Sequence, residues 1–207
     1  MNFLQRIFGS AEESPEEKKK ETEARQFDAL KYDGIAALKI GQVDYAVTCF
    51  SHALQLRDDL EIHDHLSVAY IHQNQKANAV NELRLLADAQ PDNQAVWVRM
   101  ARVCYMMEDY DRMAEACERA EAVGAGSAEV SYLYAEARQG QGDKEAAVVL
   151  LGEAIARDEH HGAAYLLRGQ ILMEMDRLEE AETDADYLLD HADLEEDIVI
   201  LKARIAH

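Results

Sequence analysis

A repeat of about 34 residues constrains the fold of this chain more than any other feature of its sequence. One column of small residues recurs at intervals of 33, 34, 34 and 34, at Gly34, Ser67, Ala101, Ala135 and Gly169. The same intervals separate the residues of two further columns, which are Ala46, Ala79, Met113, Ala147 and Ala181, and Ala53, Leu86, Ala120, Ala154 and Leu188. Three columns that share one period indicate a chain of five similar units stacked on one another.

Each unit is predicted to contain two antiparallel helices. The chain has only two Pro and ten Gly among 207 residues, and no stretch alternates β-branched residues between turn signals, which favours helix over strand. Polar or glycine-containing breaks lie inside units at 39–45, 139–145 and 174–180, and between units at 90–93, 124–127 and 158–161. Between units, Pro91 should end a helix because it lacks an N–H, and Gly124 because it can take a positive φ.

The sulfur-rich stretch 97–120 raises the alternative of a metal or redox site. It holds four of the seven Met and two of the three Cys. Trp97, Met100 and Cys104 share one helical face, and Met113 and Cys117 form a stripe on the following helix. Because these positions follow the packing columns, we expect the sulfur side chains to form core, with no metal and no cofactor.

The units resemble the tetratricopeptide repeat. The match is best in WVRMARVCYMMEDYDRMAEACERA, where Trp97, Ala101, Tyr110 and Ala120 stand at motif positions. Residues 142–158 and 34–56 also fit well, and the resemblance covers residues 27–193 in five repeats. It implies an all-α fold, a right-handed superhelical solenoid of about five helix pairs, with a long N-terminal helix and a C-terminal capping helix.

The two ends of the chain extend this organisation. Ser14, Pro15 and Glu17 form a strong helix start, with a Ser cap, Pro at the first helical position and Glu three residues after the cap. We therefore expect one helix from about Pro15 to Ile40. The predicted organisation is a flexible segment at 1–14, a repeat array at 15–193 with repeats at 27–59, 60–93, 94–127, 128–161 and 162–193, and a capping helix at 194–207.

The resemblance also implies where a partner would bind. In this family the first helices of the repeats line a concave face that takes ligand peptides. The aligned residues are mostly apolar and suit an amphipathic helix or an extended peptide. The predicted partner-binding residues are Lys31, Ile35, Leu38, Val68, Ile71, Val98, Arg102, Tyr105, Tyr132 and Glu136, and Glu61, Leu166, Gln170 and Met173 align with the same face. The alternative is that the curvature of the array buries several of them.

Two terminal stretches are candidates for assembly. The first has one apolar helical face, formed by Phe3, Leu4, Ile7 and Phe8. It could be a frayed terminus, a peptide that docks into a groove, or a weak membrane anchor that needs a second signal. In the C-terminal helix, Val199 and Ile200 fall off the stripe that would cover the last repeat, which indicates a contact surface or a homo-oligomer.

The formal net charge of −20 disfavours some classes of partner. Non-specific binding to nucleic acid or to an anionic membrane relies on Lys and Arg, so we expect neither from charge alone. Twelve acidic residues lie between Glu174 and Asp197, against only Arg177. They predict either a solvated helix face or an attraction for a basic partner segment.

The predicted function is a scaffold or adaptor that binds a partner peptide or helix in the concave groove. No phosphate loop, G-x-S-x-G or other catalytic constellation occurs, so we do not expect an enzyme. With no secretory signal, no membrane-spanning run and three Cys that form no disulfide framework, we expect a cytoplasmic protein. The alternatives are a self-assembling structural protein, which uses its N-terminal segment or C-terminal helix, and a chaperone for secreted subunits.

Overall fold

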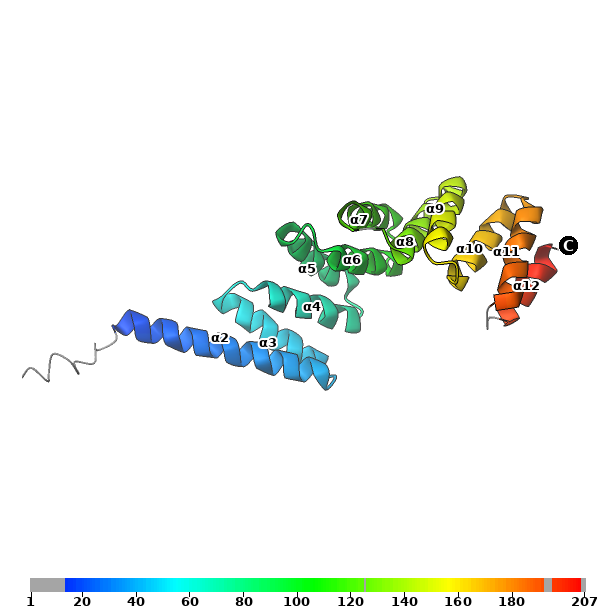
Figure 1. Ribbon diagram of the computed structural model, residues 1–207. Coiled ribbons are helices and arrows are strands. Elements are labelled where there is room, and N and C mark those ends of the chain that lie inside the picture. Colours follow the sequence, from blue (N-terminus) through cyan, green and yellow to red (C-terminus); the bar gives the residue numbers. More distant parts are fainter. Residues whose placement is uncertain (1–13, 125, 192–194, 206–207) are drawn as a thin grey trace, which may run out of the picture. The chain divides into compact units, whose positions relative to one another are not determined.

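The computed structural model describes residues 14–124, 126–191 and 195–205, with the side chains of 195–199 left out. These residues form eleven helices and no strand (Figure 1). The helices are α2 (Pro15–Lys39), α3 (Val43–Leu56), α4 (Leu60–His72), α5 (Lys76–Ala89), α6 (Gln94–Met106), α7 (Tyr110–Val123), α8 (Ala128–Gly140), α9 (Lys144–Arg157), α10 (Gly162–Glu174), α11 (Leu178–His191) and α12 (Glu195–Ile205). The predicted all-α fold is confirmed, and the helices end at the breaks seen in the sequence.

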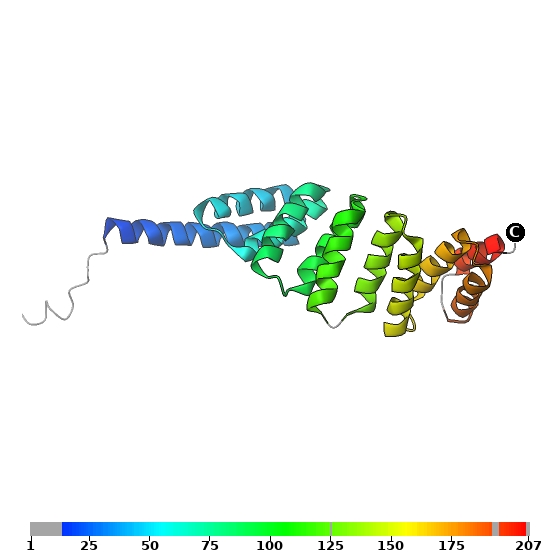
Figure 2. The same ribbon diagram turned by 90° about the horizontal axis from the view of Figure 1, so that it is seen from above.

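The chain divides into two compact units, residues 1–74 and 75–207. The first unit contains α2, α3 and α4, and α3 packs against both of the others. The second contains α5 to α12, in which each helix packs against the next along the chain. Figures 1 and 2 show the helices of the second unit following one another as neighbours along the chain. This is the arrangement expected of stacked helix pairs.

All fifteen residues of the three sequence columns are buried. The helices need small residues there because they approach each other closely. A Cβ built on Gly34 would lie 2.5 Å from a ring carbon of Phe50, and one on Gly169 would lie 3.0 Å from a methyl carbon of Leu201 in α12. The columns therefore mark the places where helices pack on one another.

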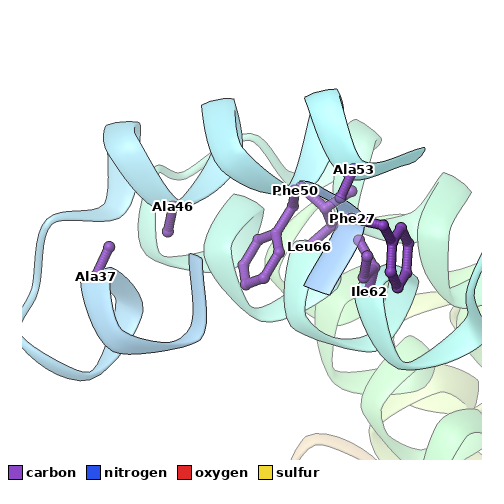
Figure 3. Close-up of a cluster of buried hydrophobic side chains, with 7 residues drawn as sticks. All are labelled: Phe27, Ala37, Ala46, Phe50, Ala53, Ile62 and Leu66. Atoms are coloured by element: carbon purple, nitrogen blue, oxygen red, sulfur yellow. The ribbon is translucent and has the colours of Figure 1, made fainter. Parts of the chain in front are cut away.

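The first unit has its own hydrophobic core, to which all three helices contribute (Figure 3). The buried side chains are Phe27 and Ala37 from α2, Ala46, Phe50 and Ala53 from α3, and Ile62 and Leu66 from α4. In the second unit a comparable cluster joins α8, α9 and α10, through Ala135, Ala147, Leu151, Ala154, Ala164 and Ile171. Burial of such apolar surface is the main favourable term in the stability of both units.

The predicted long N-terminal helix is confirmed, together with its start signal. Ser14 Oγ accepts a hydrogen bond from the Glu17 N–H at 3.2 Å, and the Glu17 carboxylate accepts one from the Ser14 N–H at 2.7 Å. Residues 14–26 are all exposed, so this part of α2 extends about three turns before the packed region begins at Phe27. Its polar side chains support it through pairs such as Arg25 with Glu21 at 2.6 Å.

Two details of the sequence interpretation are wrong. Met106 is not core, because 44% of its surface is exposed. Gly124 does not use a positive φ; its φ is −111°, and Gly126 takes the positive value of 64°. Gly124 is required by close approach, since a Cβ there would lie 1.9 Å from Nε2 of Gln94.

The C-terminal helix packs against α10 and α11, as expected of a cap. Its Leu201 is 1% exposed, whereas Ile200 is 48% exposed. The side chain of Val199 and the segment with Phe3, Leu4, Ile7 and Phe8 lie outside the described residues. In the part of the chain that is described, no helix is long and apolar enough to cross a membrane.

Candidate partner-binding face

The second unit brings five of the predicted partner-binding residues onto two neighbouring helices. Val98, Arg102 and Tyr105 lie at i, i+4 and i+7 on α6, and Tyr132 and Glu136 lie at i and i+4 on α8. The two helices pack directly against each other. All five side chains are half-buried or exposed, and Tyr105 is 45% exposed. We call these five residues the α6–α8 face.

The repeat explains why these side chains lie together. Val98 and Tyr132 are 34 residues apart, as are Arg102 and Glu136. The first packing column occupies a different side of the same helices, for example at the buried Ala101. Because each helix turns its column residue towards its neighbours, the same other positions of α6 and α8 stay at least partly open to solvent in both repeats.

Glu136 is the electrostatic centre of the α6–α8 face. Partial burial raises the pKa of its carboxyl group, although a hydrogen bond with Tyr132 and the charge of Arg102 act in the opposite direction. The Glu136 charge is in turn the main reason why the pKa of Tyr105 is raised. Burial and the same charge raise the pKa of Tyr132. The carboxylate therefore lies within electrostatic range of both tyrosines.

Arg102 does not neutralise Glu136 by direct contact, because it forms an ion pair with Glu129 in the first turn of α8. The side chain of Arg102 is 61% exposed and that of Glu129 is 50% exposed. Beside them an open pocket of about 430 Å³ is lined by Gln94, Ala95, Val98, Arg99, Arg102, Ser127 and Glu129. The pocket thus continues the α6–α8 face towards the N-terminal ends of α6 and α8.

His161 belongs to the same region, although the sequence did not point to it. Its ring stacks on that of Tyr132 at 5.1 Å between centroids, and its Nδ1 accepts a hydrogen bond from the Ala164 N–H at 3.2 Å. It therefore caps α10 and fixes the ring of Tyr132 at the same time. One sequence signal could have found it: His161 follows Ser127, the N-cap of α8, by one period of 34.

In the first unit the predicted residues are less available. Lys31 lies with its Nζ 3.2 Å from Asp59 and 2.6 Å from Glu61, and its side chain is only 14% exposed. Ile35 and Leu38 pack against the core cluster of this unit, which fits the alternative of partial burial. Val68 and Ile71, on α4, are half-buried.

The acidic run of the last repeat is partly neutralised inside the second unit. Asp184 is only 2% exposed and accepts two hydrogen bonds from the guanidinium of Arg168, at 2.9 and 2.5 Å. Other members pair at the surface, such as Glu174 with Lys144 at 3.1 Å and Glu180 with Arg177 at 2.7 Å. The run is therefore in part a set of structural ion pairs, which the sequence did not predict.

The described residues contain no group of three or more His, Cys, Asp or Glu that could hold a metal ion. Of the sulfur side chains in 97–120, Cys104, Met113 and Cys117 are buried as expected of core. Cys104 and Cys117 are free and buried, and burial raises the pKa of their thiols to about 11 and about 12. Thiols of this kind remain protonated at neutral pH and are poor nucleophiles and metal ligands.

Comparisons with known proteins agree with this geometry. A family model described as tetratricopeptide repeat matches residues 138–205. The fold resembles a structure of MamA from Desulfovibrio magneticus RS-1, with 15% identity, coverage of 86% of this chain and 96% of that one, and a TM-score of 0.70. It also resembles PilF of Pseudomonas aeruginosa, with 15% identity, coverage of 89% and 85%, and a TM-score of 0.67.

A third similar structure is YrrB, described as a TPR protein with an unusual peptide-binding site. It is 14% identical, with coverage of 84% of this chain and 90% of that one and a TM-score of 0.73. No curated protein matches the chain in sequence. The handedness of the superhelix and the repeat boundaries stay predictions. Residues 138–205 thus match the tetratricopeptide repeat family model, and the fold of the chain resembles that of solved tetratricopeptide repeat proteins.

Proposed function

We propose that the chain is a non-enzymatic adaptor that binds a peptide or helix of a partner protein on the α6–α8 face. The observation that carries this proposal is the combination of an exposed Tyr105 with half-buried Val98, Tyr132 and Glu136 on adjacent helices. Aromatic side chains supply contact area at little entropic cost, and partly buried polar groups fix orientation. The peptide-binding site named for the similar YrrB supports the same use of the fold.

The non-enzymatic part of the proposal rests on the chemistry of the buried groups. The three cysteines are buried, and the raised pKa values of Cys104 and Cys117 leave them without reactive thiolate near neutral pH. Reduced core cysteines also suit the cytoplasmic location that belongs to this proposal.

The test is capture of partners from a cell lysate, with Tyr105→Ala compared with the wild-type chain. We expect Tyr105→Ala to lose a specific partner, because it removes the most exposed aromatic ring of the face. The matched control is Val149→Ala, which removes a side chain that is 62% exposed on the second helix of the fourth repeat. Equal retention of the partner by both variants would exclude this face as the binding site.

The self-assembling alternative keeps one supporting observation, the exposed Ile200 on α12. An apolar side chain on a terminal helix can join two copies of a repeat array. Light-scattering mass over a range of concentrations tests this, on the full chain, on Ile200→Lys and on a chain lacking residues 1–9. A mass that falls to that of one chain in either variant identifies the stretch that joins the protomers; a monomeric wild type excludes the alternative. The chaperone for secreted subunits is a variant of the adaptor and would bind through the same face.

A further inference from the structure

The α6–α8 face carries a negative charge that the described residues leave without a contacting cation. Glu136 is half-buried, and no Lys or Arg of the described chain forms an ion pair with it. Arg102, whose charge acts on Glu136, forms its ion pair with Glu129 instead. A partly buried carboxylate without a cation is costly to keep ionised, because burial removes water from the charge. A ligand that supplies a positive charge would remove this cost on binding.

The neighbours of Glu136 favour a cation as the ligand. Tyr132 lies one helical turn before Glu136 on α8, and its ring is fixed by stacking on His161 at 5.1 Å. Tyr105 lies on the adjacent helix within electrostatic range of the same carboxylate and is 45% exposed. Aromatic faces attract ammonium and guanidinium groups, and the attraction grows when the groups are partly removed from water. A carboxylate between two tyrosines is thus suited to the end of a Lys or Arg side chain.

Resting on the proposed function, we propose that the α6–α8 face binds its partner through a Lys or Arg side chain, which donates to Glu136 and lies against Tyr105 and Tyr132. The rest of the chain agrees with a basic partner, because the formal net charge is −20. A field of this sign speeds the encounter with a basic segment. The net charge does not determine where the basic segment binds. The position of Glu136 determines it.

The experiment begins with a displayed library of random twelve-residue peptides, selected against the immobilised full chain. The best peptide is synthesised together with a copy in which its Lys becomes norleucine or its Arg becomes citrulline. Fluorescence anisotropy then measures the affinity of both peptides for the wild-type chain, for Glu136→Gln and for Glu115→Gln. Glu115 is an exposed acid on α7, so its variant removes the same charge away from the face.

We expect the selected peptides to share a basic residue. Glu136→Gln should weaken binding by about ten- to a hundredfold, the loss typical of a hydrogen bond to a charged group. On the wild-type chain, the neutral peptide should bind more weakly than the basic peptide by a similar factor. On Glu136→Gln the two peptides should bind with nearly equal affinity, because the change in the peptide and the change in the protein remove the same interaction. Glu115→Gln should change the affinity less than twofold. Glu136→Gln must unfold at the same or a higher temperature, which shows that the loss is not a folding defect.

Three other results would overturn the inference. Selected peptides that share no basic residue would support the binding face but exclude the basic anchor. Peptides whose binding is abolished by Tyr105→Ala and unchanged by Glu136→Gln would lead to the same conclusion. A library that yields no peptide bound above background would overturn the proposed function and the anchor together.

Discussion

Lys31 and Glu136 are charged residues on the first helices of their repeats, and both were predicted to face a partner. In the structure, Lys31 has ion-pair partners and Glu136 has none among the described residues. Lys31 lies between two carboxylates, at 3.2 Å from Asp59 and 2.6 Å from Glu61. Glu136 lies one helical turn after Tyr132 and has no contacting cation in the described part of its unit. The comparison separates a charge that is neutralised within the fold from a charge that the proposed ligand would neutralise.

In the first unit, Lys31 with its partners Asp59 and Glu61 forms what we call the closed site, and its position follows from helix capping. Asp59 is the N-cap of α4, where its carboxylate accepts from the N–H groups of Glu61 and Ile62. The same carboxylate binds Lys31 of α2. Burial opposes ionisation of both partners, but their hydrogen bonds outweigh it, so the pKa of Lys31 is raised and that of Asp59 is lowered. The pair therefore joins the start of α4 to α2.

The largest effect should come from breaking the most buried closed pair, Arg168 with Asp184. In Arg168→Ala, Asp184 stays buried at 2% exposure without its cation. We expect a loss of about 3 kcal/mol in the free energy of unfolding, as for other buried pairs that lose one partner. Denaturant titration followed by circular dichroism measures it. The control Arg119→Ala removes an exposed Arg from α7 and should cost under about 0.5 kcal/mol; equal costs would show that the buried pair contributes nothing special.

A smaller loss is expected at the closed site of the first unit. Lys31→Met keeps the length of the side chain but removes the ammonium between Asp59 and Glu61, which leaves Arg57, at 3.6 Å from Asp59, as the remaining cation there. We expect a cost of about 1 kcal/mol, because the site is partly open to water. Lys20→Met, in the exposed start of α2, is the control and should be neutral. A stability of Lys31→Met equal to that of the control would make this ion pair irrelevant to the fold.

The pH dependence of that cost has a definite sign. The raised pKa of Lys31 makes its contribution complete below the unfolded value of 10.5 and lost as the pH rises through the folded value. The lowered pKa of Asp59 makes its contribution present above the unfolded value of 3.8 and lost as the pH falls through the folded value. The cost of Lys31→Met should therefore be constant from about pH 4 to about pH 10. Unfolding titrations at pH 3, 5, 7 and 9 test this, and a cost that changes between pH 5 and 9 would contradict it.

The smallest effect on stability, and one of opposite sign, is expected at Glu136, which we call the open site. Because the pKa of Glu136 is raised above 4.5, the folded chain binds its proton more tightly than the unfolded chain, and stability falls as the pH rises through this range. Glu136→Gln should thus raise the unfolding midpoint by about one degree at pH 7. The gain should disappear as the pH falls to the unfolded pKa of Glu136. Thermal unfolding at pH 4 and pH 7 measures both, and a lower midpoint at pH 7 would mean that Glu136 is held by contacts the fold needs.

The fold could be predicted from the sequence because its columns record local helix packing. Gly34 is small because Phe50 occupies the space beside it, and that requirement repeats in each unit. The charged contacts could not be predicted in the same way. Lys31 meets Asp59 and Asp184 meets Arg168 only after helices from different parts of a unit pack together, and no residue spacing encodes those approaches. Met106 was mistaken for core because it lies in the sulfur-rich stretch, where Cys104 and Met113 do occupy buried positions.

The family resemblance predicted which helices and positions form the α6–α8 face. The structure adds which of its charges are paired and how far they are buried. Nothing in the residues around Glu136 indicates that its charge would lack a cation, since Arg102 precedes it by one period. The side chain of Arg102 turns instead to Glu129. His161 was overlooked because a polar residue in a turn is expected on solubility alone, and its stacking on Tyr132 depends on the approach of α10 to α8.

The buried cysteines have a practical consequence for spectroscopy. Cys49, Cys104 and Cys117 are 3%, 0% and 1% exposed, so a maleimide dye has no access to their sulfur atoms while the chain is folded. A single cysteine introduced at an exposed position, such as Glu115, can then carry a fluorophore or spin label without removal of the native thiols. Distances within each unit, and the arrival of a peptide at Glu136, become measurable on a chain whose interior is unaltered.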